Sequence, residues 1–252
     1  IQLLHDLSAP DAKVRKKTLR VLRGRLEVRA MSARHPDLVP LASEVARAHA
    51  DPEVRCTCVS LLTNITPDGP VPGWLITAMN DPHPWVQHSA LYAVNYFFGP
   101  ELFDPITRIL AGAQDIQLAQ HAARALAELP DARAIVQLVA TLKRSFPPYP
   151  TAPIDAQERI FRQMYLGIAL ALARYGEHAV PDLVALLEHA DPGRRAAAVV
   201  ALRVIGDPTS RPAVAKLHSD PDPDVRQQAE LCDKIWGDSF TLRPHATLSN
   251  GA

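Results

Sequence analysis

The stretch DPGRRAAAVVALRVIGDP at residues 191–208 decides the fold. It opens on the dipeptide Asp191-Pro192, and a run rich in small and apolar residues follows. An aspartate before a proline suits a helix start, because the carboxylate accepts backbone N–H groups as the N-cap and proline at the first helical position gives up no hydrogen bond. Proline also discourages the preceding helix from continuing. The stretch therefore predicts a helix that begins next to Asp191.

The same mark recurs along the chain. Asp-Pro dipeptides stand at residues 51–52, 81–82, 191–192 and 220–221, and Pro10-Asp11 and Gln114-Asp115 occupy equivalent places. Neighbouring marks are mostly separated by about 29 to 42 residues, which is the range of helical solenoid repeats. Each mark follows one apolar stretch and precedes another, so every repeat is predicted to contain two helices.

The stretch after each mark has apolar or small residues at offsets 0, 4, 7 and 8, which form one face of a helix with 3.6 residues per turn. The sets are Val14, Thr18, Val21, Leu22; Val54, Cys58, Leu61, Leu62; Val86, Ala90, Ala93, Val94; and Leu118, Ala122, Ala125, Leu126. Small residues at the middle positions let a neighbouring helix approach closely, as stacked helix pairs require. These faces are the predicted core.

We therefore expect an all-α protein of about seven helix pairs, with no strand. The second helices are predicted to start near Ala12, Pro52, Pro84, Gln114, Ile154, Pro192 and Asp222. Residues 146–153 contain four prolines and interrupt the fifth pair, because such a segment is not helical. The repeat pattern stops after Trp236, so a solenoid over residues 1–236 and a tail over 237–252 are expected.

The stretch at 191–208 resembles the HEAT repeat, particularly its bacterial, phycobilisome-lyase-like form. The segments DPEVR at 51–55, DPDVR at 222–226 and AARAL at 122–126 repeat its signature, whereas Gln87 and Tyr165 stand where an arginine is usual. The resemblance implies a right-handed α-solenoid whose second helices line the concave side. It does not imply one function, because members are scaffolds, adaptors and occasionally enzymes.

A second face of the helix after Pro84 is aromatic. With about 100° per residue, Trp85, His88, Tyr92 and Tyr96 fall on a stripe turned away from the core set. Trp and Tyr give a large contact area at low entropic cost, so the stripe is a candidate binding surface, with Gln120 and Arg124 beside it on the next second helix. The alternative is that these rings pack against a neighbouring repeat or a long loop.

The corresponding face of the later repeats is apolar. It carries Leu166, Leu170, Ala196, Val200 and Leu231. Such a face is covered by something, either the C-terminal tail or a partner.

Charge is segregated although 27 basic and 27 acidic residues sum to zero. The basic residues cluster between Asp11 and Arg34, and a candidate basic patch contains Lys13, Lys16, Lys17, Arg20 and Arg23. A basic amphipathic helix can hold a phosphate or an acidic partner. The alternative is an ordinary solvated terminal helix.

The nearest enzyme class with this kind of fold is the HEAT-like DNA glycosylases that excise alkylated bases. Their sites combine aromatic side chains with a carboxylate, and Asp81 with Trp85, Tyr92 and Tyr96 is a similar combination. However, residues 51–140 hold more acids than bases, which opposes binding to a phosphate backbone. We keep this class as the alternative function, with nucleic acid as a less favoured partner.

Other chemistry finds little support. Glu177-His178 and Glu188-His189 have the reverse order of the His-Glu dyads that bind two irons, so an iron site is not expected. The thiols of Cys56 and Cys58 point to different faces of a helix and therefore lack the geometry of a zinc site. The longest nearly uncharged apolar run, at 164–173, is about half a membrane span. We expect a cytoplasmic, non-catalytic scaffold or adaptor without metal or cofactor, which binds a protein or peptide.

Overall fold

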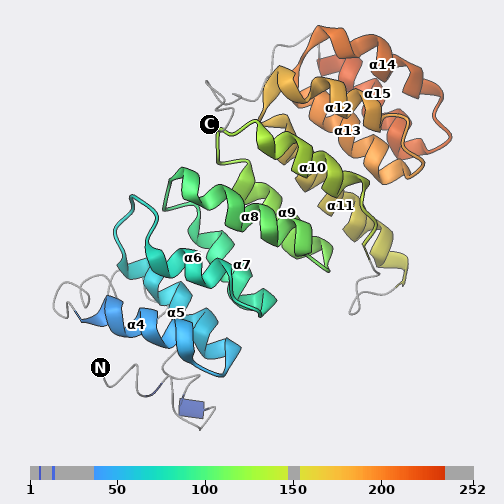
Figure 1. Cartoon of the computed structure of the whole chain (residues 1–252). Coiled ribbons are helices and arrows are strands. Elements are labelled where there is room, and N and C mark those ends of the chain that lie inside the picture. Colours follow the sequence, from blue (N-terminus) through green and yellow to red (C-terminus); the bar gives the residue numbers. More distant parts are fainter. Residues whose placement is uncertain (1–5, 7–12, 15–36, 147–153, 236–252) are drawn as a thin grey trace. The chain divides into compact units, whose positions relative to one another are not determined.

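The computed structural model describes residues 37–146 and 154–235, together with residues 6, 13 and 14. Two compact units meet between residues 106 and 107, a boundary that falls within helix α8 (Phe103–Gly112). Within the described ranges the backbone is helical apart from turns and one isolated bridge between Gly69 and Phe97. The all-α fold class is therefore confirmed (Figure 1).

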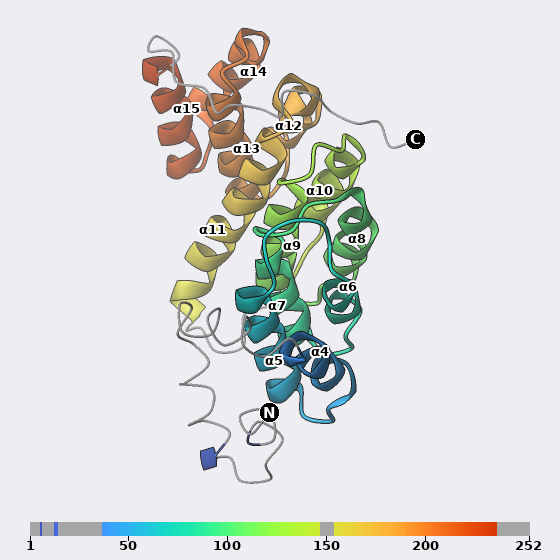
Figure 2. The same cartoon turned by 90° about the vertical axis from the view of Figure 1, so that its left-hand side faces the viewer.

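Over residues 37–106, the first unit contains two complete helix pairs. They are α4 (Leu38–Ala48) with α5 (Pro52–Ile65) and α6 (Gly73–Met79) with α7 (Pro84–Ala93). The second helices α5 and α7 pack against each other, as Figure 2 shows, and α6 contacts both α4 and α7. A short 3-10 helix, η1 (Pro100–Leu102), leads into α8.

The second unit continues the alternation. Its helices are α9 (Ile116–Leu126), α10 (Arg133–Lys143), α11 (Ile154–Ala173), α12 (Val180–Leu186), α13 (Pro192–Ile205), α14 (Arg211–Ala215) and α15 (Pro223–Ile235). Three 3-10 helices join them, namely η2 (Gly176–Ala179), η3 (Pro208–Ser210) and η4 (Lys216–Ser219). The second helices α9, α11, α13 and α15 contact one another in chain order. In Figure 2, α11, α13 and α15 lie side by side.

The predicted helix starts and core positions are confirmed where the structure describes them. Second helices begin at Pro52, Pro84, Ile116, Ile154, Pro192 and Pro223, each within two residues of its predicted start. The predicted core residues of three repeats are all buried: Val54, Cys58, Leu61, Leu62, Val86, Ala90, Ala93, Val94, Leu118, Ala122, Ala125 and Leu126. Burial raises the pKa of the Cys58 thiol to about 12, so this cysteine is a small hydrophobic core residue.

Several predictions fall outside the described residues. These are the first predicted second helix near Ala12, almost all of the proline-rich segment at 146–153, and the tail at 237–252. Among residues 37–146 and 154–235, no helix is both long enough and apolar enough to cross a membrane.

The role predicted for the Asp-Pro dipeptides is right at two positions and wrong at two. Asp51 and Asp191 are N-caps, and their carboxylates accept backbone N–H groups from Glu53 and from Gly193 and Arg194. Asp81 and Asp220 instead lie two residues before the caps of α7 and α15. The physical reason is that each of these two carboxylates is bound by an arginine of the preceding repeat.

The two arginine–aspartate contacts are nearly identical, and we call them the inter-repeat ion pairs. Arg55 Nε donates to Asp81 at 2.7 Å and Nη2 at 2.9 Å; Arg195 Nε and Nη2 donate to Asp220 at 2.8 and 2.7 Å. Each Nη1 also donates to two backbone carbonyls just before its own helix, those of residues 49–50 and 189–190. Each guanidinium therefore joins the start of one second helix to the start of the next.

A third link, which lies in the second unit, connects helices that are two repeats apart. Arg162 on α11 donates to Asp222 at 2.8 Å and to Asp224 at 3.0 Å, both at the start of α15. A Cβ at Gly193 would lie 3.1 Å from Cγ of Arg162, which is tighter than ordinary van der Waals contact. Glycine at the start of α13 therefore lets the Arg162 side chain pass over that helix.

Because these links contain carboxylates, we expect the stability of the protein to fall at acid pH. Hydrogen bonds from Arg195 lower the pKa of Asp220 below its ordinary value, and hydrogen bonds from Arg162 do the same for Asp222. The stabilisation is then present above the unfolded carboxyl pKa of about 3.9 and is lost as pH falls through the lower folded pKa. We expect the free energy of unfolding, measured by urea titration, to fall steeply below about pH 4.

The variant Asp220→Asn tests this assignment. Its stability deficit relative to the natural sequence is expected to shrink as pH falls from 7 toward 3. The reason is that protonation of Asp220 removes from the natural protein the same ion pair that the substitution removes. A deficit that stays constant over this range would assign the acid sensitivity to other groups.

Candidate functional site

The aromatic stripe predicted on the helix after Pro84 lies on α7 and is exposed. Trp85 is 64% exposed and Tyr92 is 61% exposed, His88 is also exposed, and Tyr96 is half-buried just beyond the helix. With His83, which caps the helix, these rings form what we call the aromatic row: His83, Trp85, His88, Tyr92 and Tyr96. The opposite face holds Val86, Ala90 and Ala93 in the core.

Ring–ring contacts organise the aromatic row at both ends. The rings of His83 and Trp85 lie 5.0 Å apart between centroids at an interplanar angle of 66°. The rings of Tyr92 and Tyr96 lie 6.1 Å apart at 60°. No Asp, Glu, Lys or Arg occurs within α7, so the exposed face of this helix is aromatic and polar without formal carboxylate, ammonium or guanidinium charge.

The two residues predicted to stand beside the stripe belong to the second unit. Arg124 is exposed near the end of α9, whereas Gln120 is half-buried. A Cβ at Gly167 of α11 would collide with the amide of Gln120, so this side chain lies in the contact between α9 and α11. Of the predicted basic patch, Lys13 is described and exposed, and Lys16, Lys17, Arg20 and Arg23 lie outside the described residues.

The carboxylate required by the glycosylase interpretation is not available. Asp81 is 8% exposed, and the guanidinium of Arg55 and the backbone N–H of His83 bind it. Burial opposes ionisation of this carboxyl, but these bonds outweigh burial and lower its pKa. Asp81 is therefore engaged as a structural ion-pair partner.

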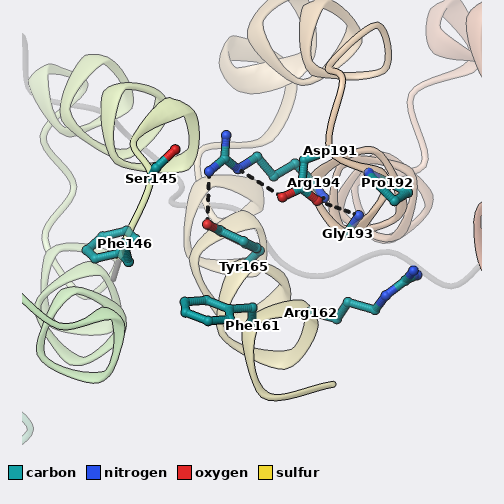
Figure 3. Close-up of a pocket in the computed structure, with 9 residues that line it drawn as sticks. All are labelled: Ser145, Phe146, Phe161, Arg162, Tyr165, Asp191, Pro192, Gly193 and Arg194. Carbon is teal, nitrogen blue, oxygen red and sulfur yellow. Dashed lines mark hydrogen bonds and ion pairs between the residues drawn. The ribbon is translucent and has the colours of Figure 1, made fainter. Parts of the chain in front are cut away.

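The second unit contains a pocket of about 320 Å³ that the sequence analysis did not anticipate (Figure 3). Three parts of the chain form it: the segment just after α10, the second and third turns of α11, and the start of α13. Its lining residues are Ser145, Phe146, Phe161, Arg162, Tyr165, Asp191, Pro192, Gly193 and Arg194. A volume near 300 Å³ is at the lower end of the range for small-ligand or side-chain pockets.

Arg194 forms a buried wall of this pocket. Its guanidinium carbon lies 4.7 Å from the centroid of the Tyr165 ring, and Nη2 donates to the Tyr165 hydroxyl at 2.9 Å. It also donates to the carbonyls of Lys143 and Arg144. Nη1 also lies 2.8 Å from Nε2 of His189, so the two terminal nitrogens together contact four polar atoms of the protein. Arg194 therefore fixes α10, α11 and α13 to one another.

A shallow groove adjoins the pocket along α11, α13 and α15. Its volume is about 340 Å³, and it shares Arg162 and Gly193 with the pocket. Part of its lining is made of small or aliphatic side chains, namely Leu166, Ala196, Ala197 and Val200. Polar side chains also line it, namely Gln163, Asp224, Gln227 and Gln228. Leu166, Ala196 and Val200 are half-buried, so the apolar face predicted for the later repeats is partly accessible.

Neither surface contains a recognisable catalytic arrangement. Asp191 in the pocket caps α13, and His189 accepts the Asp191 backbone N–H through Nδ1 at 3.0 Å. Burial, and then the nearby Arg194, lower the pKa of His189. Within the described ranges, no group of three His, Cys, Asp or Glu side chains is placed to hold a metal ion.

One signal in the sequence could have indicated the inter-repeat ion pairs. The tetrapeptide His-Ala-Asp-Pro occurs at 49–52 and again at 189–192, with Arg55 and Arg195 three residues after each proline. In both copies the histidine Nδ1 accepts the backbone N–H of the capping aspartate. The pocket has no comparable signal, because residues from three separate parts of the chain form it.

Comparison with known proteins supports the repeat assignment. Residues 161–232 match the family model described as HEAT repeats, so the expected resemblance is confirmed in the C-terminal part of the chain. This range contains α12–α14 and most of α11 and of α15. A comparison with curated protein sequences gives no match.

Several solved structures are similar at low identity. A designed armadillo repeat protein is 20% identical with a TM-score of 0.37, covering 93% of this chain and 98% of its own. An engineered protein is 17% identical with a TM-score of 0.39, at 96% and 97% coverage. Human deoxyhypusine hydroxylase in complex with glycerol is 19% identical with a TM-score of 0.29, at 94% and 96% coverage.

Proposed function

We propose that this HEAT-repeat protein is a non-catalytic binding module that holds a protein or peptide partner on the exposed face of its second helices. One observation carries the proposal: Trp85 and Tyr92 are more than half exposed on the same face of α7. Exposed apolar patches often mark interaction sites. Large aromatic side chains bury a large area on binding and lose few rotamers, which is why they dominate interface energies.

The alternative that these rings belong to the core is not supported by their exposure. The buried side of α7 is made by other residues, Val86, Ala90, Leu91 and Ala93. Most of the ring surface of Trp85 and Tyr92 therefore lies outside the packing of the first unit. The groove along α11, α13 and α15 offers a second such face in the second unit.

The double variant Trp85→Ala/Tyr92→Ala tests the proposal. We expect it to lose capture of the partner in pull-down experiments with mass spectrometry, because the two largest exposed rings of the row are removed. Its melting temperature is expected to stay nearly unchanged, because neither side chain is buried.

Phe98→Ala is the matched control. Phe98 is 66% exposed and belongs to the same unit, but it lies beyond α7, where its backbone N–H donates to Gly69. This variant should retain the captured proteins. Capture that persists in the double variant, or a loss of several kcal/mol of stability in it, would contradict the proposal.

Nucleic acid is not favoured as the partner. The carboxylate of Asp81 is engaged by Arg55, and α7 carries no Lys or Arg to contact phosphates. Binding of duplex DNA that weakens steeply with salt, together with excision of alkylated bases by the natural chain, would favour the glycosylase class instead.

A further inference from the structure

We propose that Arg226, at the start of α15, binds an aspartate of a partner protein in the way that Arg55 and Arg195 bind aspartates of this chain. The inference goes beyond the proposed function, because it concerns the last described second helix and not the aromatic row. It rests on an arginine geometry that occurs three times, twice with its aspartate in place and once without.

Arg226 has the same position and the same backbone contacts as the two arginines of the inter-repeat ion pairs. Each of the three lies four residues after the N-cap of its helix. Nη1 of Arg226 donates to the carbonyls of Asp220 at 2.7 Å and of Pro221 at 3.1 Å. Nη1 of Arg55 and of Arg195 donates to the carbonyls at the same two places before the cap. Because the guanidinium is planar and rigid, these bonds turn the edge formed by Nε and Nη2 toward the side of the next repeat.

Among these three arginines, Arg226 lacks its aspartate. In the other two copies, Nε and Nη2 donate to a carboxylate that lies 26 or 25 residues later in the chain. Within residues 37–146 and 154–235, the same groups of Arg226 donate to no acceptor. At the corresponding spacing after Arg226 the sequence has Gly251 and Ala252, and neither side chain carries a carboxylate. One side of α15 packs against α13 (Figure 2), and no described second helix follows α15.

A glutamine in the same position shows what the arginine adds. Gln87 lies four residues after the cap of α7, and its amide donates to the carbonyl of Asp81 at 2.9 Å. One amide N–H is therefore enough to satisfy this carbonyl. Binding both oxygens of a carboxylate takes the two parallel N–H groups of a guanidinium. Arg226 thus presents a fork of donors that the contacts within its own repeat do not use.

The surroundings of Arg226 indicate a partner that is held by charge. Four residues after the arginine, the two closed copies have a completely buried valine, Val59 or Val199. The open copy has Glu230 there, and this side chain is exposed. An exposed carboxylate does not offer the apolar contact of a stacked repeat, and it repels a broadly acidic partner. The chemistry that fits is a single aspartate at the start of a partner's helix, presented as in the closed copies.

Glutamine variants of the full chain test whether the fork is open. Arg195→Gln should shift the midpoint of urea unfolding to a clearly lower concentration, because the buried carboxylate of Asp220 loses its bidentate partner. Arg226→Gln should leave the midpoint nearly unchanged, because the amide can keep a carbonyl contact as Gln87 does and no carboxylate loses its partner. Equal shifts in the two variants would show that the fork is already occupied within the chain, and the inference would be wrong.

A fluorescein-labelled peptide of residues 216–231 tests the ligand, because it carries Asp220 in its own sequence context. Fluorescence anisotropy in a low-salt buffer is expected to show saturable binding of this peptide to the full chain. The Asp220→Asn peptide should bind about tenfold more weakly, and Arg226→Gln in the full chain should weaken binding of the original peptide to a similar extent. Arg159→Gln is the matched control: it removes an exposed arginine of α11 and should leave binding unchanged.

Three results of the peptide experiment would overturn the inference. The first is equal binding of the two peptides, which would mean that the aspartate is not recognised. The second is unchanged binding to Arg226→Gln, which would place the peptide on another site of the chain. The third concerns Asp238, the one acidic residue among residues 236–252. Tighter peptide binding to Asp238→Asn would assign the fork to a carboxylate of the chain itself instead of a partner.

Discussion

Asp220→Ala is expected to lower the free energy of unfolding by about 3–5 kcal/mol. The side chain of Asp220 is 4% exposed and that of Arg195 is 11% exposed, so the substitution leaves a guanidinium buried without its counter-ion. Asp220 also accepts the backbone N–H of Asp222 at 2.9 Å, and this bond is lost as well. Urea unfolding at pH 7, followed by circular dichroism, measures the effect.

An exposed ion pair of the same chemistry provides the control. Arg47 and Glu44 on α4 lie 2.6 Å apart, but their side chains are 60% and 61% exposed. Because solvent screens such a pair, Arg47→Ala should change the free energy of unfolding by no more than about 0.5–1 kcal/mol. If Asp220→Ala is as mild as Arg47→Ala, the inter-repeat ion pairs are not what joins successive repeats.

The same reasoning extends to the first unit. Asp81→Ala removes the equivalent partner of Arg55 and should be about as destabilising as Asp220→Ala. The two sites have the same geometry but lie in different repeats. A similar loss of stability at both would therefore be attributable to the ion pairs and not to other features of either site.

Local rules predicted the helices well because a solenoid is built mainly from contacts between sequence neighbours. Apolar offsets of 0, 4, 7 and 8 located the buried faces of α5, α7 and α9 residue by residue. The start of α9 was predicted two residues early, near Gln114, because the cap at Asp115 is not followed by a proline that would mark the first turn.

The same local rules could not distinguish two roles of one dipeptide. Asp51-Pro52 and Asp81-Pro82 look alike in sequence, yet the first aspartate caps a helix and the second binds an arginine 26 residues earlier. The difference depends on Arg55 and on the two residues inserted before the cap at His83, which only the packing of adjacent repeats brings together.

Of the candidate surfaces, one could likewise be predicted from local rules and the other could not. The exposed face of α7 lies on one helix, so stepping about 100° per residue was enough to find Trp85 and Tyr92. The pocket next to Arg194 joins residues of α11, of α13 and of the segment after α10, and no periodicity within one helix predicts it. The position of Gln120 also required the structure, because it depends on the close approach of Gly167.

The second large effect is expected at Tyr175, which lies just after α11 and is 1% exposed. Its hydroxyl donates toward two carbonyls at the end of α9, that of Leu126 at 2.8 Å and that of Leu129 at 3.1 Å. Tyr175→Ala removes a buried aromatic ring and leaves a cavity, so we expect a loss of about 3–5 kcal/mol in the free energy of unfolding.

Tyr175→Phe separates the ring from the hydroxyl. This variant keeps the packing but leaves the carbonyls of Leu126 and Leu129 without their donor, which should cost about 1–3 kcal/mol. The exposed Tyr92→Ala serves as the reference and should change stability by less than either, because its ring lies mostly in solvent. Equal losses in Tyr175→Phe and Tyr175→Ala would mean that the hydrogen bonds, and not the buried ring, account for the stability at this junction of α9 and α11.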